Sequence, residues 1–266
     1  MMANELNFNG IVVAITGGAR GIGRATALGF ADRGAHVVTC DRLELELEQT
    51  RGDIVRRGAE CTTSVLDVRD QTAVQQWALH VEATVGRVDV LINNAGGGFW
   101  APFMDVAAKG QNALIAENFT QVADVTRAFV PLMGRGGSII NVTSIEAHRA
   151  GPGFGIYSAM KAAVENLTKT LSLELADRGI RVNAIAPDMI ETPGDNELVA
   201  DSSALIEGMD STPIGRYGTP DDAVGPMLFL ASPLSSFVTG STIHLDGGTS
   251  AAFGWKRRRD DDRWML

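Results

Sequence analysis

Cysteine is scarce in this chain of 266 residues, which contains only Cys40 and Cys61. Both fall in strand-like runs and neither has metal-ligand spacing, so we interpret them as buried free thiols in a reducing compartment and expect no metal site. The chain also lacks an apolar run long enough to span a membrane. Its first residues, Met-Met-Ala-Asn-Glu-Leu-Asn-Phe, do not have the form of a signal peptide. These absences predict a soluble, cytoplasmic protein.

Basic residues are outnumbered, with 23 lysines and arginines against 32 acidic residues and a formal net charge of −9. This balance argues against general binding to nucleic acid or to an anionic membrane. Hydrophobic residues make up 45% of the chain, enough for a sizeable core, and no Pro/Ser-rich or charge-rich linker interrupts it. We therefore expect a single domain over residues 1–266.

Strand and helix patterns alternate along the chain. Apolar runs predict strands at 10–16, 35–40, 60–65, 88–92, 138–142, 180–185 and 241–245, with helical patterns at 24–32, 43–57, 70–85, 109–133, from 157 onward and at 220–231. This alternation is typical of an α/β fold with a doubly wound parallel sheet of the Rossmann type, which binds ligands at the carboxyl ends of its strands.

Two segments do not follow this alternation. Residues 194–212 are acidic and weakly patterned, which fits a substrate lid. The tail at 249–266 carries basic and acidic residues that neutralise one another, so we interpret it as a solvated or subunit-bridging end.

A glycine-rich turn, Thr16-Gly-Gly-Ala-Arg-Gly-Ile-Gly23, joins the first predicted strand to the first helix. Backbone N–H groups and the positive end of a helix would meet there and could bind a phosphate. The spacing of Gly17, Gly21 and Gly23 differs from the G-x-G-x-x-G fingerprint but can do the same physical work.

Asp41 ends the second predicted strand, where dinucleotide-binding folds hold a ribose 2′-OH. Its carboxylate would accept hydrogen bonds from the ribose of NAD and repel the 2′-phosphate of NADP, although Arg20 and Arg42 would counter that repulsion. We expect NAD as the cofactor, with NADP second. The alternative is that Asp41 only caps the helix at 43–57.

Two further strand ends carry candidate cofactor residues. Asp67 and Val68 follow the third strand, beside a possible adenine site, and Asn93-Asn-Ala-Gly-Gly-Gly98 follows the fourth. The small residues there would let a nucleotide approach the backbone closely. Phe99 and Trp100 come next, and either line a substrate pocket or pack in the core.

The stretch from Asn141 to Lys161 holds a hydroxyl, a phenol and an amine. Tyr157 and Lys161 stand four residues apart on a predicted helix and share a face, and the intervening loop can bring Ser144 to them. A free tyrosine has a pKa of about 10, and a nearby ammonium lowers it. Serine could then hold a substrate oxygen while the phenolate takes its proton. By itself, the Tyr/Lys spacing also fits a partly buried Tyr157 and an exposed Lys161 without a shared function.

Taken together, the motifs resemble those of the short-chain dehydrogenase/reductase family over residues 8–248. The resemblance is carried by Thr16-Gly-x-x-x-Gly-x-Gly23, Asn93-Asn-Ala-Gly96, Ser144 and Tyr157-x-x-x-Lys161, which occur in family order and at family separations. It implies that Tyr157 transfers the proton, that Lys161 holds the nicotinamide ribose and lowers the tyrosine pKa, and that Ser144 orients the substrate.

The same resemblance assigns supporting roles. Asn118 would support a water chain to the lysine, and a homotetramer is expected. The implied cofactor-binding residues are Gly17, Arg20, Gly21, Ile22, Gly23, Asp41, Asp67, Val68, Asn94, Ala95, Gly96, Tyr157, Lys161, Pro187, Ile190 and Thr192. One departure lies at Asp188, where the family usually has glycine after Pro187. A carboxylate there puts cofactor affinity in question.

The leading hypothesis is an NAD-dependent oxidoreductase that moves a hydride between a secondary alcohol or ketone and nicotinamide. A mostly apolar pocket is expected from Gly98, Phe99, Trp100, Glu146, His148, Phe154 and Met189, suited to a cyclic or steroid-like alcohol.

Two alternatives remain open. One is a 3-oxoacyl thioester reductase using NADPH, because the pattern is also similar to the acyl-carrier-protein reductase branch. Against it, acidic residues in the expected lid would repel an acidic carrier protein. The other is a scaffold that binds NAD(H) without turnover.

Overall fold

The computed structural model describes residues 6–192, 212–257 and 263–265. Seven strands form one parallel sheet in the order β3-β2-β1-β4-β5-β6-β7. They are β1 (Val12–Thr16), β2 (His36–Asp41), β3 (Cys61–Val65), β4 (Val88–Asn93), β5 (Met133–Val142), β6 (Arg181–Pro187) and β7 (Thr242–Leu245). All seven predicted strands are confirmed. β5 begins earlier than expected because Met133 pairs with Val88 ahead of a register shift, in a glycine-rich stretch without an apolar pattern.

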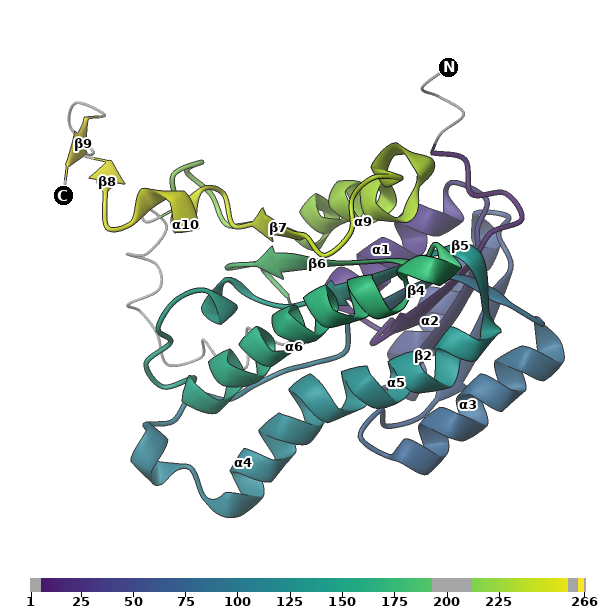
Figure 1. Ribbon diagram of the computed structural model, residues 1–266, viewed down its shortest axis with the longest axis horizontal. Helices are drawn as coiled ribbons and strands as arrows, with labels where there is room; N and C mark the ends of the chain where they lie inside the picture. The colour runs from purple at the N-terminus through teal and green to yellow at the C-terminus, as the bar shows by residue number, and fades with distance from the viewer. Residues whose placement is uncertain (1–5, 193–211, 258–262, 266) are drawn as a thin grey trace.

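Helices cover both faces of the sheet (Figure 1). One face packs against α1 (Gly21–Ala31), α2 (Glu44–Arg56) and α9 (Val224–Ala231), and the other against α3 (Gln71–Thr84), α5 (Gln121–Phe129) and α6 (Gly155–Glu174). Phe30 and Met227 lie in the first core, and Trp77 and Phe129 in the second. The predicted doubly wound α/β architecture is therefore confirmed.

The strand order reverses between β1 and β4, which lie side by side in the register Val13 to Val90 and Ile15 to Ile92. All five residues of β1 are buried, as expected for a strand covered on both faces. The chain leaves β1 and β4 toward opposite faces, which opens a crevice at their carboxyl ends where doubly wound sheets bind ligands.

The long helical region predicted at 109–133 is not uniform. It consists of α4 (Ala108–Ile115), a π-helical turn (Ala116–Thr120), α5 and a 3₁₀ turn (Val130–Leu132). The π-helical turn contains the fully buried Asn118. Turns of this kind are rare and frequent at functional sites.

The predicted lid at 194–212 lies outside the described residues except for Thr212. In the tail, α10 (Thr249–Ala252) is followed by two short antiparallel strands, β8 (Lys256–Arg257) and β9 (Trp264–Met265), which the sequence pattern did not indicate. Within the described part of the chain, no helix has both the length and the apolar character needed to cross a membrane.

Candidate active site

The glycine turn after β1 requires its glycines. Gly17 and Gly21 have φ values of 73° and 57°, in the region that favours glycine. A Cβ at position 23 would lie 2.0 Å from the carbonyl oxygen of Gly17 and 2.5 Å from Asn94 Nδ2, so a larger residue would displace the turn. The turn therefore brings the start of α1 directly over the end of β1.

The start of α1 is suited to an anion. Arg20 occupies the N-cap position but its side chain makes no capping hydrogen bond, and no acidic residue lies in the first turn. The first N–H groups of a helix have no intrahelical acceptor, so here they can receive a phosphate. Ile22 packs in part against the core beneath the turn. The turn fits the pyrophosphate of a dinucleotide.

The loop after β4 is tied to the end of β1. The Asn94 amide donates to the carbonyl oxygens of Thr16 (3.0 Å) and Gly17 (3.1 Å), and the backbone N–H groups of Asn94 and Ala95 each donate to Thr16 Oγ1 at 3.0 Å. These bonds fix both sides of the crevice at the point where the strand order reverses. This role of the Thr16 side chain was not predicted, although Thr16 is the first residue of the glycine motif.

Two carboxylates lie at and after the ends of β2 and β3. Asp41 accepts the N–H of Ala19 on Oδ2 (3.0 Å) and the N–H of Leu43 on Oδ1 (3.1 Å). It therefore joins β2 to the glycine turn, whereas the N-cap of α2 is Leu43. Asp67 is paired with Arg69 at 2.5 Å, and hydrogen bonding from Arg69 lowers the pKa of Asp67. Val68 is half-buried beside it.

Glycines 96 and 98 mark a space beside the predicted catalytic residues. A Cβ at position 96 would lie 3.1 Å from both Lys161 Nζ and Asn118 Oδ1, and one at position 98 would lie 3.3 Å from the Tyr157 ring. Lys161 Nζ lies 5.5 Å from the centroid of that ring. The loop after β4, the π-helical turn and α6 therefore converge on one point.

Ser144 comes two residues after the end of β5. Its Oγ accepts the backbone N–H of Glu146 at 3.2 Å and so caps a short 3₁₀ turn (Ile145–Ala147). This bond uses a lone pair of Oγ and leaves its O–H as a donor. Ser144 is largely buried, and the turn fixes its rotamer beside the ends of β5 and β6.

Lys161 is a buried cation. It is 4% exposed, and its Nζ donates to the carbonyl oxygen of Val142 at 3.1 Å. Burial lowers the pKa of Lys161 to about 8, while the charge of Glu117 acts in the opposite direction. Glu117 was not among the predicted residues, and only its place beside Asn118 could have indicated it.

Asn118 is held by three hydrogen bonds. Its Nδ2 donates to the carbonyl oxygens of Gly97 (2.8 Å) and Leu114 (3.0 Å), and its Oδ1 accepts the N–H of Gly97 at 3.3 Å. Nearby, Gln121 donates to the carbonyl oxygen of Ala95 at 2.8 Å. Both amides hold the loop after β4 against the helices.

The residues after β6 lie against the glycine turn. A Cβ at position 21 would come within 3.3 Å of Thr192, so one ligand could contact both. Pro187 is the buried last residue of β6, and Ile190 is buried in a bridge with Gly218.

The predicted pocket residues fall into two groups. Phe99, Trp100 and Met189 are 39%, 61% and 37% exposed, so none of them is a core residue, although the Phe99 ring lies against Gly110 of the next helix, α4. Trp100 lies against Gly153, and the Phe154 ring stands 6.2 Å from the Tyr157 ring. Phe154 and the neighbouring Trp100 give an apolar wall near Tyr157.

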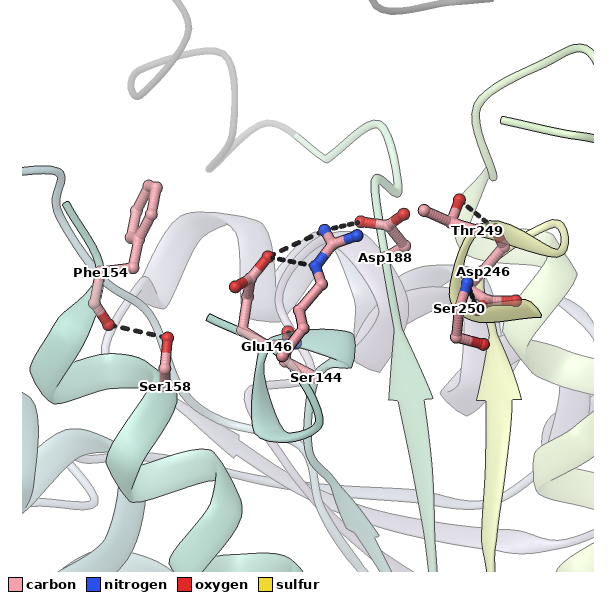
Figure 2. Close-up of polar contacts among 9 residues, drawn as sticks. Ser144, Glu146, Phe154, Ser158, Asp188, Asp246, Thr249 and Ser250 are labelled. Atoms are coloured by element: carbon pink, nitrogen blue, oxygen red, sulfur yellow. Dashed lines mark hydrogen bonds and ion pairs between the residues drawn. The ribbon is translucent and has the colours of Figure 1, made fainter. Parts of the chain in front are cut away.

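The second group is polar and ionic. Glu146 Oε1 accepts hydrogen bonds from Arg149 Nε (3.1 Å) and one terminal nitrogen (2.9 Å), and the same nitrogen donates to Asp188 Oδ1 at 3.2 Å. Figure 2 shows Glu146 and Asp188 on the loops after β5 and β6, above the strand ends. We call Glu146, Arg149 and Asp188 the rim network. Arg149 was not among the residues predicted from the sequence.

His148 makes its polar contact elsewhere. Its Nε2 lies 3.2 Å from Glu165 Oε2 on α6, and its ring stands 4.5 Å from the ring of His244 on β7. No cluster of potential metal ligands occurs within the described ranges.

The site can be compared with those of known proteins. The family model described as enoyl-(acyl carrier protein) reductase matches residues 17–250. The chain is 39% identical to the 3-oxoacyl-[acyl-carrier-protein] reductase FabG of Thermotoga maritima, over 91% of this chain and 99% of the relative. It is 35% identical to the gluconate 5-dehydrogenase of Gluconobacter oxydans, over 92% and 97%.

A solved structure adds the fold. A candidate NAD(P)-dependent gluconate 5-dehydrogenase from Beutenbergia cavernae, with NADP bound at low occupancy, is 35% identical and superposes with a TM-score of 0.88 over 93% of this chain and 99% of that one. All these proteins are oxidoreductases by their descriptions. The matched range contains the three glycines of the turn after β1, together with Tyr157 and Lys161. The chain therefore belongs to the short-chain dehydrogenase/reductase family and is a nicotinamide-dependent oxidoreductase that acts on CH–OH or keto groups.

Proposed function

We propose that this oxidoreductase interconverts a secondary alcohol and its ketone, with Tyr157 exchanging the proton of the substrate oxygen. The observation that carries the proposal is the convergence of Tyr157 and Lys161 on the space that Gly96 and Gly98 leave open. Ser144 caps the turn at the adjacent strand end. A proton donor and acceptor, an orienting hydroxyl and a nearby cation are the groups that such a reaction needs.

Each residue has a distinct task. Ser144 donates a hydrogen bond to the substrate oxygen, and Tyr157 takes the alcohol proton as the C–H bond breaks. The Lys161 ammonium favours the phenolate form of Tyr157. A bound nicotinamide would supply the hydride acceptor, so the products would be a ketone, the reduced cofactor and a proton on Tyr157. Asn118 positions the loop that carries Gly97.

The glycine turn, Asp41, Asp67 and the Asn94 loop would hold the dinucleotide. NAD is the preferred cofactor in this proposal, because Asp41 is fixed beside the glycine turn where a 2′-phosphate would meet a carboxylate. The NADP bound in the similar structure and the FabG relative favour NADP, so the preference needs its own test. Asp41→Ala should lower the ratio of kcat/KM with NAD to that with NADP by about tenfold or more, equivalent to at least about 1.4 kcal/mol. An unchanged ratio would remove Asp41 from this role.

The function itself is tested by a panel of secondary alcohols and ketones assayed with both cofactors, in the wild type and in Tyr157→Phe. The variant should retain cofactor binding and lose about 10²-fold to 10⁴-fold in kcat, the range for a general acid or base. Retention of most activity would refute the role of Tyr157.

A second candidate is reduction of a 3-oxoacyl thioester with NADPH, favoured by the matched family model and by the FabG relative. Acetoacetyl thioesters in the same panel separate the two reactions. A scaffold that binds NAD(H) without turnover would fail with every substrate.

We also propose a homotetramer and a cytoplasmic location from the family resemblance, and sedimentation of the purified protein would test the assembly.

A further inference from the structure

The rim network joins two strand ends at the substrate side of the sheet. Val142 of β5 pairs with Ile185 of β6, and the N–H of Thr143 donates to the Ile185 carbonyl at 2.8 Å. Ser144 and Asp188 follow these strand ends, and adjacent strands lie about 4.8 Å apart. Arg149 bridges the two loops by its contacts with both carboxylates. The network therefore stands beside the hydroxyl that orients the substrate.

The charge of the network is negative. Its two carboxylates are 19% and 13% exposed, and they hold the single guanidinium, which is 41% exposed. The sum is one negative charge. Because Arg149 already pairs with Glu146 and Asp188, it cannot offer a bidentate fork to a substrate carboxylate without losing those partners. A third carboxylate at this place would meet net repulsion.

The network also has polar atoms beyond its own ion pairs. The contacts engage Nε and one terminal nitrogen of Arg149 and one oxygen of Asp188, which leaves a second terminal nitrogen and a second carboxylate oxygen outside them. Glu146 Oε2 is buried without a partner among the described residues. A hydroxyl group both donates and accepts, so it matches an adjacent guanidinium and carboxylate. A carboxylate can only accept.

We propose that the rim network selects an uncharged substrate that carries a second hydroxyl group near the reacting carbon, and that it rejects the matching carboxylate. This inference rests on the proposed alcohol oxidation, since it names the substrate class of the same site. The carbon skeleton would lie against the apolar wall of Phe154 and Trp100. Asp188, a departure from the family pattern, thereby acts in substrate selection as the partner of Arg149.

Three compounds with one ring test this selection: trans-cyclohexane-1,2-diol, cyclohexanol and trans-2-hydroxycyclohexane-1-carboxylate. In the wild type, kcat/KM should be at least about tenfold higher for the diol than for cyclohexanol, and at least about tenfold lower for the carboxylate, a factor worth about 1.4 kcal/mol. Asp188→Asn, which removes one charge at constant size, should raise the ratio of kcat/KM for the carboxylate to that for cyclohexanol at least about tenfold.

Arg149→Met should remove the preference for the diol. The control is Arg127→Met, because Arg127 makes an exposed pair with Asp124 at 3.1 Å on α5. It should leave all three values unchanged. Equal use of the carboxylate and cyclohexanol by the wild type, or an unchanged ratio in Asp188→Asn, would overturn the inference.

Measurements of substrate binding without turnover distinguish this inference from the proposed function. Calorimetry on the Tyr157→Phe protein with bound cofactor should give the same ranking of affinities, diol over cyclohexanol over carboxylate, without turnover. If the ranking holds but no secondary alcohol is oxidised by the wild type, the proposed function fails and the selection stands. If cyclohexanol is oxidised but the ranking is absent in both assays, the selection fails and the proposed function stands.

Discussion

Two cations near the end of β5 have opposite surroundings. Lys161 is 4% exposed and donates to a backbone carbonyl, and burial lowers its pKa to about 8. The Arg149 side chain is 41% exposed and held by two carboxylates. A buried amine near its titration point acts strongly on a neighbouring phenol, because little water screens it. An arginine remains charged and organises carboxylates. These surroundings support the proposed roles of Lys161 in proton chemistry and of Arg149 in substrate selection.

The largest effect is expected from removing the Lys161 charge. Lys161→Met should lower kcat/KM by about 10²-fold to 10⁴-fold, because the phenolate of Tyr157 loses its nearby cation. Lys169→Met is the matched control, since Lys169 lies two turns further along α6 in a more exposed pair with Glu165. It should change kcat/KM by less than about twofold, as for most surface pairs. Similar losses in both variants would mean that the effect comes from the helix, and the comparison would not hold.

Lys161→Met should also stabilise the protein at neutral pH. Lysine normally titrates near 10.5, so a folded-state pKa of about 8 means that burial of the charged amine costs about 3 kcal/mol. The cost is complete below pH 8 and is relieved as the pH rises toward 10.5, because the unfolded chain then binds more protons than the folded one. The gain in unfolding free energy of Lys161→Met without cofactor should therefore shrink over this interval. Denaturant titrations at pH 7 and pH 10 measure it, and a gain independent of pH would contradict a depressed pKa.

Asn118→Ala should have an intermediate effect on stability and on kcat. The substitution leaves the carbonyl oxygens of Gly97 and Leu114 without their amide donor, at a cost of about 1–3 kcal/mol in stability. The loop beside Lys161 should also lose its position, which lowers kcat. Asn112→Ala, on the exposed side of α4, is the control. Equal stability of the two variants would show that the π-helical turn does not depend on Asn118.

The smallest effect on stability is expected at the rim. Arg149→Met should lower the unfolding free energy by about 1 kcal/mol, because the guanidinium is 41% exposed but the two carboxylates that lose it are mostly buried. It should lower kcat for cyclohexanol far less than Lys161→Met does. Thermal unfolding and initial rates provide the two readouts, and a loss comparable to that of Lys161→Met would erase the difference between the cations.

The two regions also differ in how far the sequence predicts them. The apolar strands and the glycine turn follow from local pattern, and the proximity of Tyr157 and Lys161 follows from their spacing, so the sheet and this pair were predicted. The rim network was not, because Arg149 stands 39 positions before Asp188 and no pattern links them. The pairing of β5 with β6 alone brings them together. The π-helical turn around Asn118 was not predicted either, because the helical sequence pattern at 109–133 is uniform there.

The proposed reaction is tested most directly by following the transferred hydride with a deuterium label. A secondary alcohol that the enzyme oxidises, carrying deuterium on the carbinol carbon, is incubated with oxidised cofactor, and the reduced cofactor is analysed by mass spectrometry. We expect one deuterium in the reduced nicotinamide with the wild type, and cofactor binding without label transfer with Tyr157→Phe. Label transfer at the wild-type rate in Tyr157→Phe would contradict the role of Tyr157.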